Sequence, residues 1–282
     1  MHGTLIVNHF LDERKFKEQT NLYMEAANRH GINLSVCTNA QSCPESDFVL
    51  FLDKDIALAR NLELTGARVF NSARAIALCD DKAYTYLSLK NSGLKMPQTL
   101  IAPMTFFQSE WNNNPFLVRA EEELGYPMII KEACGSFGRQ VWMVNNKKEL
   151  AEKLHECSPK RVILQEYVAS SCGKDVRINL VGGKSVAAMY RYSETDFRAN
   201  ISSGGKMKAY SPSDDQIRVA QDACRILGLD FGGVDLLFGK DGEPILCEVN
   251  SNAHIKNIMD CTGTNVADHI ISYICTVIGR SK

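Results

Sequence analysis

The first 70 residues alternate short apolar runs with segments of helical spacing, and this alternation limits the possible folds more than any other feature. The run Phe48-Val49-Leu50-Phe51-Leu52 is apolar throughout, which is typical of a strand buried on both faces of a sheet. We expect strands at 4–8, 32–37, 48–52 and 68–70, with helices at 15–30 and 56–64. Strands that alternate with helices predict a small parallel α/β lobe.

The remaining chain mixes helices with antiparallel hairpins. The expected hairpins join strands 127–131 and 141–144, 176–181 and 185–191, and 231–238 and 244–249. The expected helices cover 72–89 with a break near Cys79, then 147–157, 213–227 and 265–278, and a further strand covers 162–168. The stretch that contains Pro103 and Asn112-Asn113-Asn114-Pro115 reads as a linker. The fold class is therefore α/β, with α+β character in the C-terminal half.

Composition and charge exclude several classes of protein. The 282 residues carry a formal net charge of −1, which gives no overall attraction to nucleic acid or to an anionic membrane. No apolar run approaches the roughly 20 residues of a membrane-spanning helix, and we read no signal peptide. The ten cysteines include no C-x-x-C pair, which indicates reduced thiols and no zinc site. We expect a cytoplasmic protein with no nucleic-acid or membrane partner, in which cysteines such as Cys247 act as small core residues.

Two acids and one amide lie on the two strands of the last predicted hairpin. Glu248 and Asn250 are two residues apart, so they project from the same face of a strand, and the hairpin brings Asp235 beside them. Carboxylate and amide oxygens together suit Mg²⁺. The alternative is a pair of acids on a solvated sheet face, but the apolar residues that flank them favour a buried hairpin.

A glycine-bearing loop follows Lys131 on a predicted strand. Gly135 and Gly138 would let backbone N–H groups approach phosphate oxygens, and Lys131 could neutralise phosphate charge. The spacing is not that of a P-loop, and taken alone an ordinary hairpin turn explains the loop as well. The triplet Asp80-Asp81-Lys82, taken alone, indicates an exposed helix face.

Further polar residues lie between this loop and the two acids. The strand end Gln165-Glu166-Tyr167-Val168 could offer backbone groups to an adenine edge, and Asp175 could bind ribose hydroxyls, although the strand could equally be core. Arginine side chains bind phosphate or carboxylate through two parallel hydrogen bonds, unless they are simply solvated strand charges. The candidates here are Arg177, Arg191 and Arg198, with Asn200 nearby.

In their order along the chain, these elements resemble the ATP-grasp superfamily, and within it the RimK-type amino-acid ligases, the alpha-L-glutamate ligase family. The resemblance covers about residues 72–274. Its elements are Asp81-Lys82, Pro97, Lys131, residues 135–138, 165–167, 175–177 and 197–200, Gly233-Val234-Asp235 and Glu248-Val249-Asn250. It implies an ATP-grasp fold with an N-terminal Rossmann-like pre-ATP-grasp lobe over residues 1–80. A central lid subdomain with a flap loop would cover residues 81–168, and a C-terminal subdomain with the magnesium site would cover 169–282.

The resemblance also implies roles for single residues. Nucleotide contacts would come from Lys82, Lys131, the flap residues Gly135, Ser136, Phe137 and Gly138, the adenine strand Gln165, Glu166, Tyr167 and Val168, the ribose acid Asp175, and Arg198 with Asn200. Arg177, Arg191 and Arg198 would be catalytic, facing the transferred phosphate and the acyl intermediate. Asp235, Glu248 and Asn250 would hold two Mg²⁺ ions, or Mn²⁺ in their place.

The implied reaction is the ATP-dependent joining of a carboxylate and an amine through an acyl phosphate. The carboxylate would belong to a small molecule, a peptide or a carrier protein, the acceptor would be an amino acid, and the protein would be a homo-oligomer, a dimer or tetramer. Alternatives are a peptide-modifying ligase or macrocyclase, a kinase-like phosphotransferase, and a non-catalytic ATP-binding sensor on the same fold.

One segment departs from the resembled pattern. After Asn250 the glutamate ligases usually continue with a small residue, Ser, Pro and Gly, whereas residues 251–257 here read SNAHIKN. The pair Lys256-Asn257 is closer to the ligases of lysine biosynthesis. This loop faces the acceptor pocket in the family, so the resemblance does not imply that glutamate is the incoming amino acid. Asn252, His254 and Lys256 could line that pocket, although His254 could equally be a structural histidine.

Overall fold

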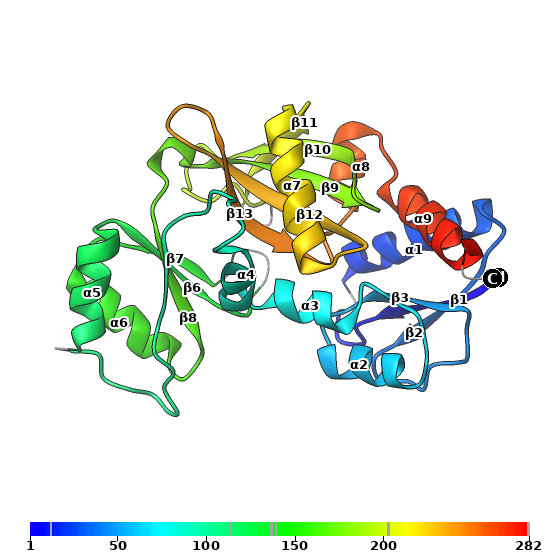
Figure 1. Cartoon of the computed structure of the whole chain (residues 1–282), viewed down its shortest axis with the longest axis horizontal. Coiled ribbons are helices and arrows are strands. Elements are labelled where there is room, and N and C mark those ends of the chain that lie inside the picture. Colours follow the sequence, from blue (N-terminus) through cyan, green and yellow to red (C-terminus); the bar gives the residue numbers. More distant parts are fainter. Residues whose placement is uncertain (12, 113, 136–137, 139, 202–203, 281–282) are drawn as a thin grey trace.

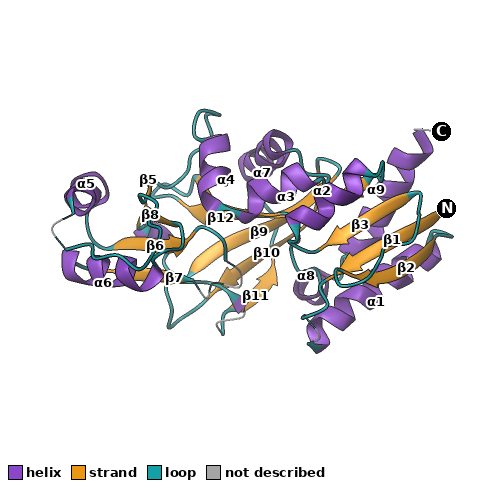
Figure 2. Cartoon of the chain, turned by 90° about the horizontal axis from the view of Figure 1, so that it is seen from below, coloured by secondary structure: helices purple, strands orange, loops and turns teal. Residues whose placement is uncertain are grey.

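The computed structural model of the chain describes residues 1–11, 13–112, 114–135, 138, 140–201 and 204–280. Its strands form three sheets, one from each successive part of the sequence (Figures 1 and 2). None of the helices within these ranges is both long and apolar enough to cross a membrane.

The first sheet is parallel and has the strand order β2-β1-β3-β4. Its strands are β1 (His2–Val7), β2 (Asn33–Thr38), β3 (Phe48–Leu52) and β4 (Val69–Phe70), and its helices are α1 (Arg14–Arg29) and α2 (Ile56–Leu64). Every residue of β3 is buried, as its unbroken apolar sequence predicts. Helix α1 buries Tyr23, Ala26 and Ala27 and ends before Gly31, which has a φ of 66°. The expected parallel α/β lobe is confirmed.

Helices α3 (Ala73–Asp80) and α4 (Lys82–Leu89) follow, and they are separated at Asp81. The Asp81 side chain accepts hydrogen bonds from the backbone N–H groups of Ala83 and Tyr84 and therefore caps α4. Its other oxygen accepts a bond of 2.8 Å from Arg161. Reading Asp80 and Asp81 as an exposed helix face was therefore wrong, because the break between the helices turns both side chains inward.

The second sheet is antiparallel, with the order β5-β8-β6-β7. It comprises β5 (Thr99–Ile101), β6 (Met128–Glu132), β7 (Val141–Val144) and β8 (Val162–Glu166), with helices α5 (Pro115–Leu124) and α6 (Lys147–Cys157). Helix α5 begins where a linker was expected. Asn114 caps it and Pro115 occupies its first turn, while Phe116 and Leu117 enter the core under the sheet. A cap followed by proline, rather than a loop, was the correct interpretation.

The third sheet has the order β11-β10-β9-β12-β13, with antiparallel neighbours throughout. Its strands are β9 (Lys174–Val181), β10 (Lys184–Tyr192), β11 (Lys206–Ala209), β12 (Phe231–Phe238) and β13 (Pro244–Asn250), preceded by the short helix η1 (Ala169–Ser171). The two predicted hairpins are present, one turning at Gly182-Gly183. Helix α7 (Asp214–Leu227) covers one face of this sheet (Figure 2). On the opposite face Val181, Met189 and Phe231 join the apolar core of the first lobe, and the polar side chains of Arg177, Asp235 and Glu248 lie on that face as well.

Helix α8 (Lys256–Thr262) lies against β10 and β11 of the third sheet, and helix α9 (Val266–Arg280) returns to the first lobe (Figure 1). Helix α9 lies against α1, and its Ile270 and Ile274 share one apolar core with Tyr23 of α1 and Leu5 of β1. The end of the chain therefore packs on its beginning, and this fixes the first lobe against the third sheet.

Candidate active site

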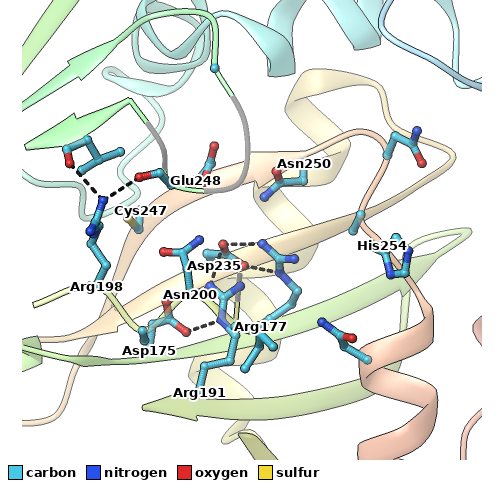
Figure 3. A pocket seen from close by; sticks show the side chains of 18 of the residues that line it. Asp175, Arg177, Arg191, Arg198, Asn200, Asp235, Cys247, Glu248, Asn250 and His254 are labelled. Carbon is cyan, nitrogen blue, oxygen red and sulfur yellow. Dashed lines mark hydrogen bonds and ion pairs between the residues drawn. The ribbon is translucent and has the colours of Figure 1, made fainter. Parts of the chain in front are cut away.

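A cavity of about 1390 Å³ lies where the three sheets meet, and it gathers the predicted site residues. Its lining includes every predicted site residue that the structure describes, namely Lys82, Lys131, Gly135, Gly138, Gln165, Glu166, Tyr167, Val168, Asp175, Arg177, Arg191, Arg198, Asn200, Asp235, Glu248 and Asn250. Ser136 and Phe137 lie outside the described residues. Figure 3 shows 18 of the lining side chains and labels ten of them, with Asp235, Arg177 and Arg191 close together at the centre of the view.

Strand alternation explains why these side chains share one face. In the third sheet Arg177, Asp235 and Glu248 are direct cross-strand neighbours, while Val176, Leu236 and Val249 point to the helix α7. A bulge precedes Glu248 in β13, because Asp235 pairs with Glu248 while Leu236 pairs with Leu246, which leaves out the residue between. That extra residue is Cys247, which lines the cavity. Its assignment to the core was therefore wrong.

Two arginines and two carboxylates form a buried network at the centre of the site (Figure 3). Arg177 donates to Asp235 through Nε at 2.6 Å and Nη2 at 2.7 Å. Arg191 donates to Asp175 through Nε at 2.6 Å and Nη2 at 2.7 Å, and its Nη2 also reaches Asp235 Oδ2 at 2.8 Å. Arg191 and Asp235 are each only 3% exposed. The four charges sum to zero, and each guanidinium is hydrogen-bonded to a carboxylate, so no charge of the network is buried without a partner.

Burial and neighbouring charge act in opposite directions on the two acids. Burial by itself would raise the pKa of Asp235, but the charges of Arg177 and Arg191 outweigh it and lower that pKa to about 2. Burial raises the pKa of Asp175, and the charge of Arg191, which it shares with Asp235, only partly offsets this. Asp235 is therefore the fixed negative charge of the network.

Two lysines lie beside Glu248 and Cys247 of β13. Lys82, the first residue of α4, places Nζ 3.3 Å from Glu248 Oε1 and donates to the Gly135 carbonyl at 3.3 Å. Lys131 on β6 is buried, with Nζ 3.8 Å from the Cys247 sulfur. Burial would raise the pKa of Glu248, yet Lys82, Lys131 and Arg177 together lower it. Two cations thus border an ionised carboxylate inside the cavity, an arrangement that suits a multiply charged anion bridged by a metal.

The donor atoms fit a hard divalent cation. Asp235 Oδ1 accepts one hydrogen bond and keeps one acceptor position, Glu248 is half-buried and ionised, and Asn250 supplies an amide. Within the described ranges the Asn250 Nδ2 atom is buried without a hydrogen-bond partner. Because amide oxygen and nitrogen can exchange places, this end of Asn250 can present an oxygen instead. Among the described residues no group of three His, Cys, Asp or Glu side chains could hold a metal ion.

Arg198 joins the glycine loop to the segment before β11. Its guanidinium pairs with Asp196 at 2.7 Å and donates to the Gly138 carbonyl at 2.8 Å. Gly138 has a φ of 69°, and a Cβ there would lie 3.1 Å from the Asn200 side chain. Arg198 therefore holds Gly138 in place through a hydrogen bond, with the Asn200 side chain close beside it.

The end of β8 forms another wall. Gln165 donates to Thr99 Oγ1 at 2.9 Å, and Glu166 accepts from the Gln98 backbone at 2.9 Å, so both side chains are held by the segment that leads into β5. Burial, together with a hydrogen bond to Cys172, raises the pKa of Tyr167 to about 12. Residues 165–168 line the cavity. Asp175, predicted to bind ribose, accepts hydrogen bonds from Arg191 with both of its carboxylate oxygens.

The first lobe contributes residues that the sequence analysis missed. Asn8 follows β1 and Asp53 follows β3, and the Asn8 amide donates to the Asp53 carboxylate at 3.0 Å and 3.2 Å. Lys54 also lines the cavity. Polar residues directly after buried parallel strands were the available signal, because ligands bind at the carboxyl ends of such strands.

The loop between β13 and α8 also faces the cavity. His254 Nε2 donates to the Lys15 carbonyl at 3.1 Å, and its ring meets Phe16 edge to face. Burial lowers the pKa of His254, so the ring is neutral at pH 7. Asn252 and Lys256 line the cavity as well.

Comparisons with known proteins agree with this geometry. Residues 79–274 match the family described as RimK-like ATP-grasp domain. The chain is 33% identical to beta-citrylglutamate synthase B of Danio rerio, over 80% of the chain and 55% of that protein, so it spans about half of that relative. It is also 33% identical to a probable alpha-L-glutamate ligase of Syntrophotalea carbinolica, over 80% of the chain and 74% of that protein.

Among solved structures, D-alanine–D-alanine ligase from Bacillus anthracis complexed with ATP is similar with a TM-score of 0.77 and 17% identity, over the whole of both chains. The likeness confirms the expected α/β fold of the ATP-grasp type.

Proposed function

The chain belongs to the RimK-like ATP-grasp family and is an ATP-dependent ligase that forms an amide bond, and from this premise we propose how its cavity is used. We propose that Lys82 and Lys131 hold the ATP phosphates beneath the loop at 135–138. The adenine lies against the backbone of 165–168, and the ribose lies near Asp175. We also propose the division of the chain into parts 1–80, 81–168 and 169–282.

Family members use ATP with divalent metal ions, which we propose to be two Mg²⁺ ions in this protein. Asp235 through Oδ1, Glu248 and Asn250 would hold them. When bound, magnesium neutralises charge on the phosphate oxygens. The unpartnered amide end of Asn250 supports this proposal, because a buried polar atom normally has a partner.

We propose that the reaction proceeds through an acyl phosphate. A substrate carboxylate oxygen bonds to the γ-phosphorus while the bond from that phosphorus to the bridging oxygen breaks and ADP leaves. The amine nitrogen then bonds to the acyl carbon, the carbon–oxygen bond breaks, inorganic phosphate leaves, and the nitrogen releases a proton. Arg177 and Arg191 stabilise the charge on the transferred phosphoryl group and on the acyl oxygen. Both guanidinium groups are already oriented by Asp235 and Asp175, so catalysis rests on positioning and charge.

The two remaining substrates would bind at the side of the cavity formed by the first lobe. Asn8, Lys54 and the loop at 252–257 line that side. We propose an amino acid as the amine and a small molecule, peptide or carrier protein as the source of the carboxylate. Because the loop after Asn250 differs from that of the glutamate ligases, amino acids other than glutamate should be tested as the amine.

The observation that carries the proposal is the meeting of Lys82, Lys131 and two arginines around Glu248 and Asn250 in one cavity. Thermal unfolding with ATP, with and without Mg²⁺, tests it. At a ligand concentration 100 times the Kd, binding should add about 2.7 kcal/mol of stability. The magnesium-dependent part of that gain should vanish in Glu248→Ala. A wild-type protein that gains nothing from ATP and Mg²⁺ beyond Mg²⁺ alone would refute the proposed site.

A further inference from the structure

Asn71 has a buried side-chain amide that links the first lobe to the loop that follows β13. It directly follows β4 and is 1% exposed. Its Nδ2 donates to the Phe231 carbonyl at 2.8 Å and to the Ser251 carbonyl at 2.9 Å. Its Oδ1 accepts from the backbone N–H groups of Asp230 at 2.7 Å and of Phe231 at 3.2 Å. All four hydrogen-bonding positions of the amide are thus used.

The loop that begins at Asn250 is held from several directions. Ser251 is buried, and its hydroxyl donates to Asp80 Oδ1 at 3.3 Å, an oxygen that also lies 3.1 Å from Lys54 Nζ. Further along, the Ile255 backbone N–H donates to Gln19 Oε1 at 3.1 Å. The partners Gln19, Lys54 and Asn71 all belong to the first lobe.

Strand β12 lies close against this loop at Gly232 and Gly233, which have no side chain that could form a hydrogen bond. A Cβ on Gly232 would lie 2.9 Å from the Asn250 carbonyl oxygen, and one on Gly233 would lie 2.6 Å from the Ala253 Cβ. The loop contains neither proline nor glycine, but Asn250, Ser251 and Asn252 are residue types that favour turns. The hydrogen bonds from Asn71 and Gln19 restrain it further.

We propose that Asn71 is a positioning residue for the metal site: through the Ser251 carbonyl it fixes the loop at 250–255 and therefore the orientation of Asn250. The role rests on the proposed function, because it is defined toward the proposed magnesium ligand. A residue that orients a metal ligand from behind typically changes metal affinity by about 10- to 100-fold when it is lost. Figure 3 shows Asn250 and His254 at the two ends of the segment that Asn71 would hold.

Binding of ADP, measured by calorimetry in EDTA and across a Mg²⁺ titration, tests this inference without turnover. Mg²⁺ is expected to increase the affinity for ADP, and the quantity compared is the Mg²⁺ concentration at which half of this increase is reached. In Asn71→Ala this concentration should be about 10- to 100-fold higher than in the wild type. The ADP Kd in EDTA should stay at the wild-type value, because no nucleotide contact is lost. Ser213→Ala, which removes the cap of α7 on the other side of the sheet, is the matched control and should leave the Mg²⁺ dependence unchanged.

Urea unfolding first establishes that each variant is folded, and if Asn71→Ala is not, Asn71→Ser takes its place because a hydroxyl retains part of the bonding. An unchanged Mg²⁺ requirement in a folded variant overturns the inference. So does a loss of ADP affinity that is equal with and without Mg²⁺, since that result indicates general loosening. If Mg²⁺ does not change the ADP affinity of the wild-type protein, the proposed metal site itself is refuted. Failure of the metal site can therefore be told apart from failure of the role proposed for Asn71.

Discussion

Replacing Arg191 with methionine should destabilise the protein strongly, and more so as the pH rises. The change removes three charge-assisted hydrogen bonds of 2.6–2.8 Å and keeps most of the apolar volume of the side chain. Asp235 retains Arg177, whereas Asp175 stays buried with no cation bonded to it among the described residues. Removing one partner of a buried ion pair typically costs about 3–5 kcal/mol of the free energy of unfolding.

The pH dependence follows from the protonation of Asp175. Burial already raises the pKa of Asp175, and loss of the arginine removes the main charge that opposes that rise. In the unfolded chain this carboxyl group loses its proton near pH 3.9. Above that pH the folded variant binds more protons than the unfolded chain, so its stability falls as the pH rises toward the folded-state pKa. The gap between wild type and Arg191→Met should therefore be wider at pH 7.5 than at pH 5.

Urea unfolding followed by circular dichroism at these two pH values measures the effect. Adding Asp175→Asn to Arg191→Met should restore much of the loss, because a neutral amide is cheaper to bury than a carboxylate. Arg225→Met is the control, since its pair with Asp222 at 2.8 Å is exposed and should be worth at most about 1 kcal/mol. A loss below about 1 kcal/mol for Arg191→Met, or an equal loss at both pH values, would refute the reasoning.

Three further changes test other parts of the account. Lys131→Met should weaken ATP binding by about 1.5–3 kcal/mol in calorimetry, since a bond to a charged group is lost; an unchanged Kd would remove Lys131 from the phosphate site. Gly138→Ala should weaken ATP binding because a Cβ meets Asn200 3.1 Å away, whereas Gly183→Ala, at a φ of 75° with open space around it, should lower stability and leave the ATP Kd unchanged. Ser213→Ala should lower the free energy of unfolding by about 1 kcal/mol in urea, and no loss would mean that the capping box of α7 contributes nothing.

Local sequence patterns predicted the elements whose signals are strong and short-range. The apolar run of β3, the Gly182-Gly183 turn and the capped helix α7 are all where the sequence placed them. Alternation along β13 and the hairpin that joins it to β12 also predicted that Asp235, Glu248 and Asn250 lie together.

What the sequence could not supply depends on contacts between distant segments. The bulge that turns Cys247 into the cavity arises from the pairing of β13 with β12. The local sequence Ile245-Leu246-Cys247 does not predict this bulge. Helix α5 was missed because Asn and Pro read equally as a loop or as a helix start. Asn71 bonds to residues 159–180 positions later, so its role appears only in the folded chain. The cytoplasmic location, the homo-oligomer and the number of metal ions remain predictions.

The most direct test of the central claim is a screen that combines amino acids with a panel of carboxylates, with ADP release and product mass measured together. Wild-type protein should release ADP only when both a suitable carboxylate and a suitable amine are present, and the product should be the amide, with one ADP for each bond formed. Glu248→Ala and Asp235→Ala should release none in an amine-dependent way. A stable phosphorylated product without an amide, ATP binding without turnover across the panel, or full activity in either variant would contradict the account.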